Sequence, residues 1–236
     1  MTALTTSTGT IPTRGRDADH PLRTLLRAAA RRALPPVDET VAVCPAPPGP
    51  CAVAVAIDGL SMVAADVPPE WVSERVPSGP GGAMSATFLA ALAGRLGAPT
   101  PGVDILLVAR KPPQAGQRAA LAPSDRVCVE WAADRTHVTC WTDTEGAGVI
   151  MIGRGPGDRL DLRVELEGAE RPWLTPATVV RGRELLEAAR TVADGDLFAS
   201  VPAYDATALR TYLCGGFRAI GAEARFRTHP TPTWFS

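Results

Sequence analysis

Apolar residues recur along this chain at two spacings, and each spacing predicts a different kind of element. Alternating or continuous apolar runs predict strands, whereas apolar residues at i, i+3 and i+4 predict amphipathic helices. The strand-type runs are Cys51–Ile57, Leu60–Val67, Val103–Ala109, Arg126–Trp131, Thr136–Trp141, Val149–Gly153, Arg159–Glu167 and Leu197–Val201, with a long strand closing the patterned region. Asp58-Gly59, between the first two runs, predicts a tight hairpin turn.

Helical spacing predicts an N-terminal helix over residues 22–34, a short one over Glu70–Val76 and a third over Met84–Leu96. Two more helices are predicted later, one opening on Gly182-Arg183 and one carrying Tyr212. Strands therefore dominate the middle of the chain, and a helix–strand–helix–strand series follows them. This order favours an α/β fold with a mixed sheet.

Composition narrows the function classes. Of the 236 residues, 45% are hydrophobic. The numbers of basic and acidic side chains, 24 and 25, are nearly equal, so no excess of positive charge indicates a nucleic-acid partner. The five cysteines include no C-x-x-C pair and the three histidines are scattered, so no metal site is predicted. No signal-type or membrane-spanning apolar run is present, which favours a cytoplasmic protein without a membrane partner.

The stretch from Val179 to Phe226 carries the most specific pattern. It contains a helix, a strand and a second helix, and runs through Arg-x-Tyr-Leu-x-x-Gly-Phe-Arg-x-Ile-Gly-x-Glu at residues 210–223. This stretch resembles the C-terminal half of the GNAT (N-acetyltransferase) superfamily. Four antiparallel strands, helix, strand, helix and terminal strand from about Arg126 to Arg227 match the order of the GNAT core. The part before it resembles the N-terminal extension of some actinobacterial GNAT-like proteins.

The resemblance implies a GNAT-like, mainly antiparallel mixed sheet flanked by helices. Residues 1–20 are polar and Thr-rich with almost no periodic apolar signal, which predicts a disordered arm. The resemblance implies a GNAT-like domain at 126–236, preceded by an N-terminal α/β portion at 21–125 packed on the core. An exposed sheet edge in the N-terminal portion leaves room for a homodimer.

The resemblance also implies acetyl-coenzyme A or another acyl-coenzyme A as cofactor, in a V-shaped opening between the fourth and fifth core strands. The cofactor-binding candidates are the backbone at Leu166 and, at the start of the next helix, Arg181, Gly182 and Arg183. Helix starts suit phosphate because their N–H groups are unpaired. The family loop reads Gln/Arg-x-x-Gly-x-Gly/Ala, whereas residues 177–182 read Ala-Thr-Val-Val-Arg-Gly, so only Gly182 matches.

Two catalytic candidates follow from the same resemblance. Tyr212 falls where relatives often keep the tyrosine that protonates the leaving thiolate, and Glu165 where they often carry a carboxylate that takes a proton from the amine. Each also has a purely structural interpretation. Leu209, Tyr212 and Leu213 have core spacing, and Glu165 fits an ion-pair ladder with Arg163 or Arg159.

Two functions of different classes stay open at this point. The first is an N-acyltransferase that moves an acyl group from acyl-coenzyme A to an amine of a small molecule. The second is a GNAT-fold protein that has lost acyl-coenzyme A use. It would serve as a small-ligand binding or regulatory module, or as a coenzyme A-independent enzyme of secondary metabolism.

Overall fold

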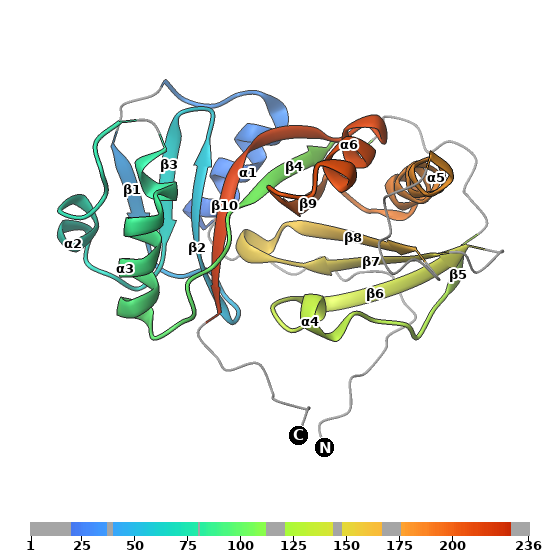
Figure 1. Ribbon diagram of the computed structural model, residues 1–236, viewed down its shortest axis with the longest axis horizontal. Helices are drawn as coiled ribbons and strands as arrows, with labels where there is room; N and C mark the ends of the chain where they lie inside the picture. Colours follow the sequence, from blue (N-terminus) through green and yellow to red (C-terminus); the bar gives the residue numbers. More distant parts are fainter. Residues whose placement is uncertain are drawn as a thin grey trace, which may run out of the picture.

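A computed structural model describes residues 20–36, 40–79, 81–111, 121–143, 148–166 and 176–227. Within these residues ten strands form one sheet in the order β1-β3-β2-β10-β4-β9-β8-β7-β6-β5 (Figure 1). The sheet is mostly antiparallel and flanked by helices, which confirms the predicted fold class. Residues 1–19 of the expected arm lie outside the described part.

The bounds of the elements are as follows. The strands are β1 (Val41–Cys44), β2 (Cys51–Ile57), β3 (Leu60–Ala64), β4 (Asp104–Ala109), β5 (Leu121–Pro123), β6 (Thr136–Asp143), β7 (Gly148–Arg154), β8 (Leu160–Leu166), β9 (Leu197–Pro202) and β10 (Arg218–Arg227). The helices are α1 (Pro21–Arg31), α2 (Pro69–Ser73), α3 (Ala86–Leu96), α4 (Val129–Ala132), α5 (Pro176–Val192) and α6 (Ala206–Cys214), with 3-10 turns η1 (Gly82–Met84) and η2 (Pro156–Asp158). None of these helices is long and apolar enough to cross a bilayer.

The hairpin predicted at Asp58-Gly59 is confirmed. Ile57 pairs with Leu60 across the turn, and the two turn residues have φ values of 47° and 88°. Such a two-residue turn needs positive φ at both positions, which Asp-Gly tolerates at low cost. The turn fixes the register of β2 and β3, and β2 in turn pairs with β10.

The strand predicted over Arg126–Trp131 is wrong. Val129–Ala132 forms helix α4, and the strand next to β6 is the short Leu121–Pro123. The physical reason is visible in the packing, because Val127 and Cys128 precede Trp131 by four and three residues, and all three contact the same cluster over β6 and β7. Helical spacing therefore competes with alternation in this stretch, and burial of the Trp131 ring favours the helix.

The predicted start of the next helix is also wrong. Helix α5 begins at Pro176 rather than at Gly182-Arg183. Proline suits a first helical turn, because its φ angle is already helical and its missing N–H would be unpaired there in any case. Gly182 is consequently buried inside the helix, beyond its first turn.

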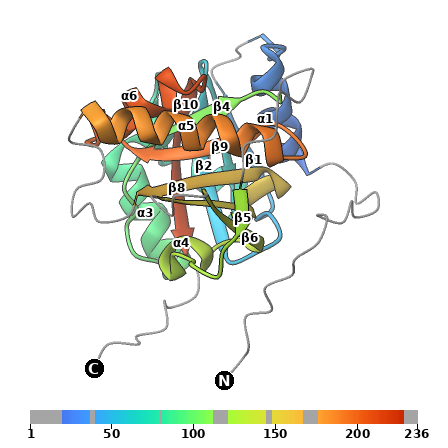
Figure 2. The same ribbon diagram turned by 90° about the vertical axis from the view of Figure 1, so that its right-hand side faces the viewer.

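Strand β4 lies between β9 and β10, antiparallel to both. One sheet therefore continues across the expected limit at residue 125, and the division into two portions stays a prediction. The register pairs give the sheet two distinct faces. Helices α3, α5 and α6 cover one, here called the α5 face, and α1 and α4 cover the other, the α1 face. Figure 2 shows α5 and α6 lying together above β9.

Candidate functional site

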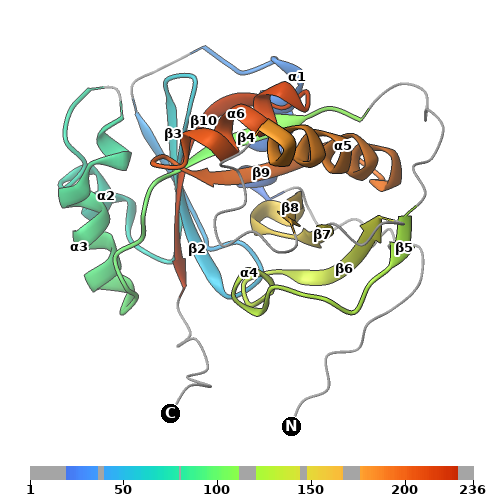
Figure 3. The same ribbon diagram turned by 45° about the vertical axis from the view of Figure 1, so that its right-hand side comes forward.

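Strands β8 and β9 are parallel but pair only at their beginnings. The register contains Leu160↔Leu197 and Asp161↔Phe198 and no later pair, although both strands are described along their full length. Beyond these pairs the strands separate, and Figure 3 shows β8 turning away from β9 together with β7, β6 and β5. The separated parts, Leu162–Leu166 and Ala199–Pro202, are here called the β8–β9 fork. Its presence confirms the splayed strand pair that the resemblance implied.

Tyr212 comes from α6 and reaches the fork from the α5 face. Its phenol oxygen accepts a hydrogen bond from the Val164 backbone, and burial raises the pKa of the phenol to about 12. The ring packs edge-to-face on Phe217 with centroids 5.2 Å apart. Tyr212 is therefore a core residue and also places a proton-bearing hydroxyl on the open edge of β8. The packing interpretation is confirmed, and the catalytic role of Tyr212 stays a prediction.

Glu165 lies on β8 one residue further along and on the opposite face. Its Oε1 accepts a hydrogen bond from Arg163 Nε at 2.7 Å, and both side chains are half-exposed. The ion-pair ladder with Arg163 is thus present, while Arg159 binds other carboxylates. A role for Glu165 as a base stays a prediction.

The expected cofactor-binding residues are brought only partly together. Leu166 ends β8 and pairs with Gly148 on β7. Arg181 forms ion pairs with Asp143 and with Glu184, the latter between Nη1 and Oε2 at 2.9 Å.

Arg183 lies 3.6 Å from Glu187, between Nη2 and Oε1. Because α5 starts at Pro176, neither these two arginines nor Gly182 occupy the helix start on which their assignment depended. Their assignment to phosphate binding stays a prediction.

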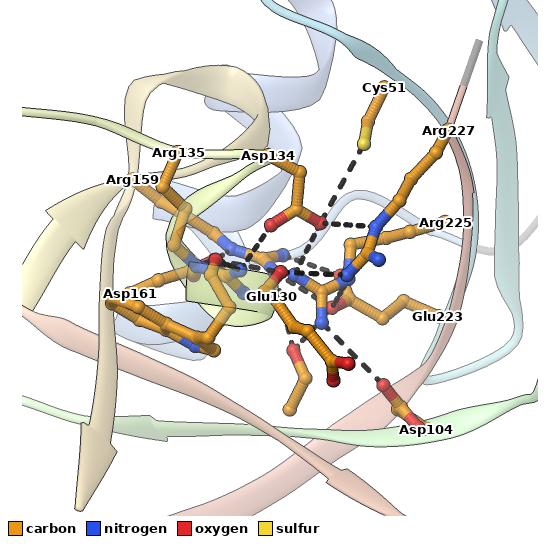
Figure 4. A network of polar contacts seen from close by, with 12 residues as sticks. Cys51, Asp104, Glu130, Asp134, Arg135, Arg159, Asp161, Glu223, Arg225 and Arg227 are labelled. Atoms are coloured by element: carbon orange, nitrogen blue, oxygen red, sulfur yellow. Dashed lines mark hydrogen bonds and ion pairs between the residues drawn. The ribbon is translucent and has the colours of Figure 1, made fainter. Parts of the chain in front are cut away.

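A buried network of charged side chains lies on the α1 face between α1 and α4 (Figure 4). Its centre is the pair of Arg159 and Glu223, joined by two hydrogen bonds of 2.7 and 2.8 Å. Arg159 also donates to Asp161 Oδ1 at 2.5 Å, and the Ser200 hydroxyl donates to Glu223. The network joins β8, β9 and β10 next to the point where the fork opens.

The network continues towards α4. Arg135 donates to Asp161 at 3.1 Å and to Asp134 at 2.5 Å, while its guanidinium stacks 4.2 Å above the Trp131 ring. Arg225 lies among the carboxylates, and its buried Nη1, 3.4 Å from Asp134 Oδ2, has no hydrogen-bond partner within the described ranges. The residues here called the charge network are Asp104, Asp134, Arg135, Arg159, Asp161, Glu223, Arg225 and, at its exposed edge, Arg227.

Burial and charge act against each other in this network. Burial alone disfavours the ionised form of Glu223, but Arg159 and Arg225 outweigh it and lower the pKa of this carboxyl to about 2. For Asp104 the balance is reversed, because burial raises its pKa more than Arg225 lowers it. Burial, and secondarily Asp134, raises the pKa of the Cys51 thiol to about 12. Cys51 is thus a protonated, unreactive thiol at neutral pH.

The sequence gives a signal for part of this network. Glu223, Arg225 and Arg227 alternate with apolar residues on β10, as do Asp161 and Arg163 on β8. Glu223 and Arg225 lie 3.5 Å apart, between Oε1 and Nε. Asp134 and Arg135 give no such signal, because they follow α4 in a turn. In the residues that the structure describes, no group of three or more His, Cys, Asp or Glu side chains is arranged to hold a metal ion.

Comparison with known proteins places these features in context. No protein-family model matches the chain, and no curated protein matches it. Among solved structures, a putative GNAT-family acetyltransferase from Novosphingobium aromaticivorans DSM 12444 is similar at 15% identity and a TM-score of 0.35, covering 53% of this chain and 63% of that one. A GCN5-related N-acetyltransferase from Sphaerobacter thermophilus is similar at 13% identity and a TM-score of 0.33, covering 62% and 58%.

The matches thus span less than two thirds of either neighbour's length. The chain's own topology carries more detail. It has four antiparallel strands from β5 to β8, helix α5, a strand β9 that parts from β8, helix α6 and the terminal strand β10. This order and pairing of elements is the arrangement that the resemblance implied.

Proposed function

We propose that this chain is an N-acyltransferase that moves an acyl group from acetyl-coenzyme A, or another acyl-coenzyme A, to an amine of a small molecule. The observation that supports this most directly is the β8–β9 fork with the Tyr212 hydroxyl on its β8 edge. A strand that parts from its neighbour leaves main-chain groups free for an extended ligand, which adds to the sheet as a further strand would.

The fork also suits the chemistry of acyl transfer. Since successive backbone N–H groups of a strand point to alternate sides, the N–H of Leu166 faces the same way as that of Val164, into the fork. Such an N–H would stabilise the oxyanion that forms when an amine attacks the thioester. Tyr212, whose phenol keeps its proton at neutral pH, would donate it to the leaving thiolate.

A second candidate is favoured by the residues of α5. Arg181 holds Asp143 and Glu184 rather than projecting free, and Gly182 is buried inside the helix. These observations favour a fork that has lost coenzyme A and binds another small ligand. The protein would then be a binding or regulatory module, or a coenzyme A-independent enzyme.

Thermal unfolding in the presence of acetyl-coenzyme A and of coenzyme A separates the two candidates. A ligand at about 100 times its dissociation constant stabilises the folded state by about 2.7 kcal/mol, which shifts the melting temperature measurably. The acyltransferase predicts such a shift for both ligands. No shift at millimolar concentration would contradict it and leave the second candidate.

A matched pair of variants tests the contribution of α5. Arg181→Gln removes an expected phosphate contact and should reduce the ligand-induced shift. Arg95→Gln, the same change at an exposed position on α3, should leave it unchanged. Equal shifts in the two variants would remove Arg181 from the cofactor site.

A further inference from the structure

Measured along the strand direction, Asp104 lies at about the same height in the sheet as the Tyr212 hydroxyl. Continuing the β8–β9 register from Leu160↔Leu197 would place Val164 beside Val201. On the other side of β9, Val201 pairs with Ile105 and the next residue, Pro202, pairs with Asp104. Asp104, the first residue of β4, therefore lies across β9 from the fork and within one residue of the level at which Tyr212 meets Val164.

Asp104 and Tyr212 approach this level from opposite faces. Tyr212 belongs to the cluster formed with α5 and α6 on the α5 face. Asp104 pairs in register with Glu223, whose side chain points into the charge network on the α1 face. An acyl group held in the fork would have a proton donor on one side and a carboxylate on the other. This arrangement suits attack by an amine from the α1 face while the thiol is protonated from the α5 face.

The carboxylates of the charge network differ in accessibility. The side chains of Asp134, Asp161 and Glu223 are 2%, 2% and 0% exposed, and each accepts a short hydrogen bond from arginine. Asp104 is 25% exposed, and its ion pair with Arg225, from Oδ2 to Nη2, is long at 3.7 Å. Glu165 is more exposed, but Arg163 holds it at 2.7 Å. Asp104 thus combines solvent access with weak pairing, which a proton acceptor requires.

We propose that Asp104 is the general base of the transfer, taking the proton of the acceptor amine in place of Glu165. This inference rests on the proposed acyltransferase function. The amine nitrogen forms a bond to the thioester carbonyl carbon and gives its proton to the Asp104 carboxylate. The C–S bond breaks, and the thiolate takes the Tyr212 proton. An amide and coenzyme A thiol result, and both side chains return to their starting states by exchange with solvent.

The surroundings of Asp104 support this role. Burial raises its pKa, and Glu223 on β10 raises it further, whereas Arg225 on β10 and Arg135 after α4 lower it. A raised pKa makes a carboxylate a stronger base near neutral pH. Arg225 is a positioning residue, because the carboxylates of Asp134 and Glu223 hold its guanidinium between them and Asp104.

The test uses acetyl-coenzyme A with a panel of primary amines, namely an aliphatic monoamine, an amino acid amide and an aminosugar, and follows thiol release. Asp104→Asn should lower kcat/KM by about 10²- to 10⁴-fold, the usual contribution of general acid–base catalysis. The melting shift given by acetyl-coenzyme A should stay as in the wild type. Asp125→Asn, the same change at an exposed position, serves as the control.

Each outcome decides between the alternatives. Wild-type turnover in Asp104→Asn, with loss confined to Glu165→Gln, overturns the assignment and leaves the acyltransferase intact. A wild-type protein that shows neither a melting shift nor thiol release overturns the acyltransferase, and this inference with it. If Asp104→Asn does not fold, Asp104→Glu keeps the charge but moves the carboxylate by one methylene. It should lower kcat with an unchanged acetyl-coenzyme A shift, and unchanged kcat would overturn the proposal.

Discussion

The phenol oxygen of Tyr212 accepts a hydrogen bond from the backbone of Val164, on a strand that has just parted from its neighbour. A buried tyrosine hydroxyl usually finds a hydrogen-bond partner. Here the hydroxyl occupies the free edge of β8. An extended acyl ligand that pairs with this edge would lie within reach of the phenolic proton.

Replacing Tyr212 by phenylalanine tests this relationship. Tyr212→Phe should lower turnover with acetyl-coenzyme A by about 10²-fold or more and leave the ligand-induced melting shift unchanged, because the ring remains and only the proton donor is lost. Tyr204→Phe, the same change at a residue that is 90% exposed, is the control. Unchanged turnover in Tyr212→Phe would confine this side chain to packing.

The charge network predicts an asymmetry between buried and surface carboxylates. Glu223→Gln removes the charge of a carboxylate that holds buried Arg159 through two hydrogen bonds, so the free energy of unfolding should fall by about 3–5 kcal/mol. Glu165→Gln removes a half-exposed pair and should cost at most about 1 kcal/mol. Urea unfolding of both variants gives the comparison. Similar losses would show that the network is not a stabilising unit.

Acid should lower the stability of the fold through protonation of the Glu223 carboxylate. Folding lowers the pKa of Glu223 from its ordinary value of 4.5 to about 2, so its contribution to stability is complete above about pH 4.5 and is lost as pH falls through 2. The melting temperature should therefore decline across this window, and less steeply in Glu223→Gln. Parallel curves for the two proteins would contradict the assignment.

Alkaline pH should lower the stability of the fold through two buried groups, the Tyr212 phenol and the Cys51 thiol, whose pKa values are raised. Burial raises the pKa of Tyr212 from 10.0 and that of Cys51 from 9.0, both to about 12. Their contribution is complete below about pH 9 and is lost as pH rises through 12, because the unfolded chain releases these protons first. Melting curves between pH 8 and about 12 should flatten when Tyr212→Phe and Cys51→Ala are combined. A decline as steep as that of the wild type would argue against these two groups.

Local patterns predicted much of the fold. The Asp58-Gly59 turn depends on neighbouring residues alone, and it is present as predicted. The fork was predicted through the resemblance, because no local pattern states where two strands part. Errors arose where two patterns competed, as at Trp131, or where a proline opened a helix earlier than the apolar spacing indicated, as at Pro176.

The charge network shows what sequence patterns leave out. Arg159 and Glu223 are 64 positions apart, and Cys51 and Asp134 are 83 apart. Alternation on β10 marks Glu223 as sharing a face with Arg225, but not whether that face meets water or other charges. Asp104, at the start of a continuous apolar run, resembles an ordinary strand end. Only the insertion of β4 between β9 and β10 brings it beside β9, one of the two strands of the fork.

Gly221 on β10 tests the pairing of β10 with β2. At this position a β-bulge shifts the register with β4, φ is 159°, and an added Cβ would lie 2.0 Å from the Ala56 carbonyl oxygen on β2. Gly221→Ala should therefore force β2 and β10 apart and lower the free energy of unfolding by about 1–3 kcal/mol or more. Gly94→Ala is the matched control, since Gly94 lies exposed in α3 with nothing within 4 Å of an added Cβ. Alanine there should stabilise by about 0.5–1 kcal/mol through its higher helix propensity. Urea unfolding should move the two variants in opposite directions, and a neutral Gly221→Ala would mean that β10 does not lie against β2 in this register.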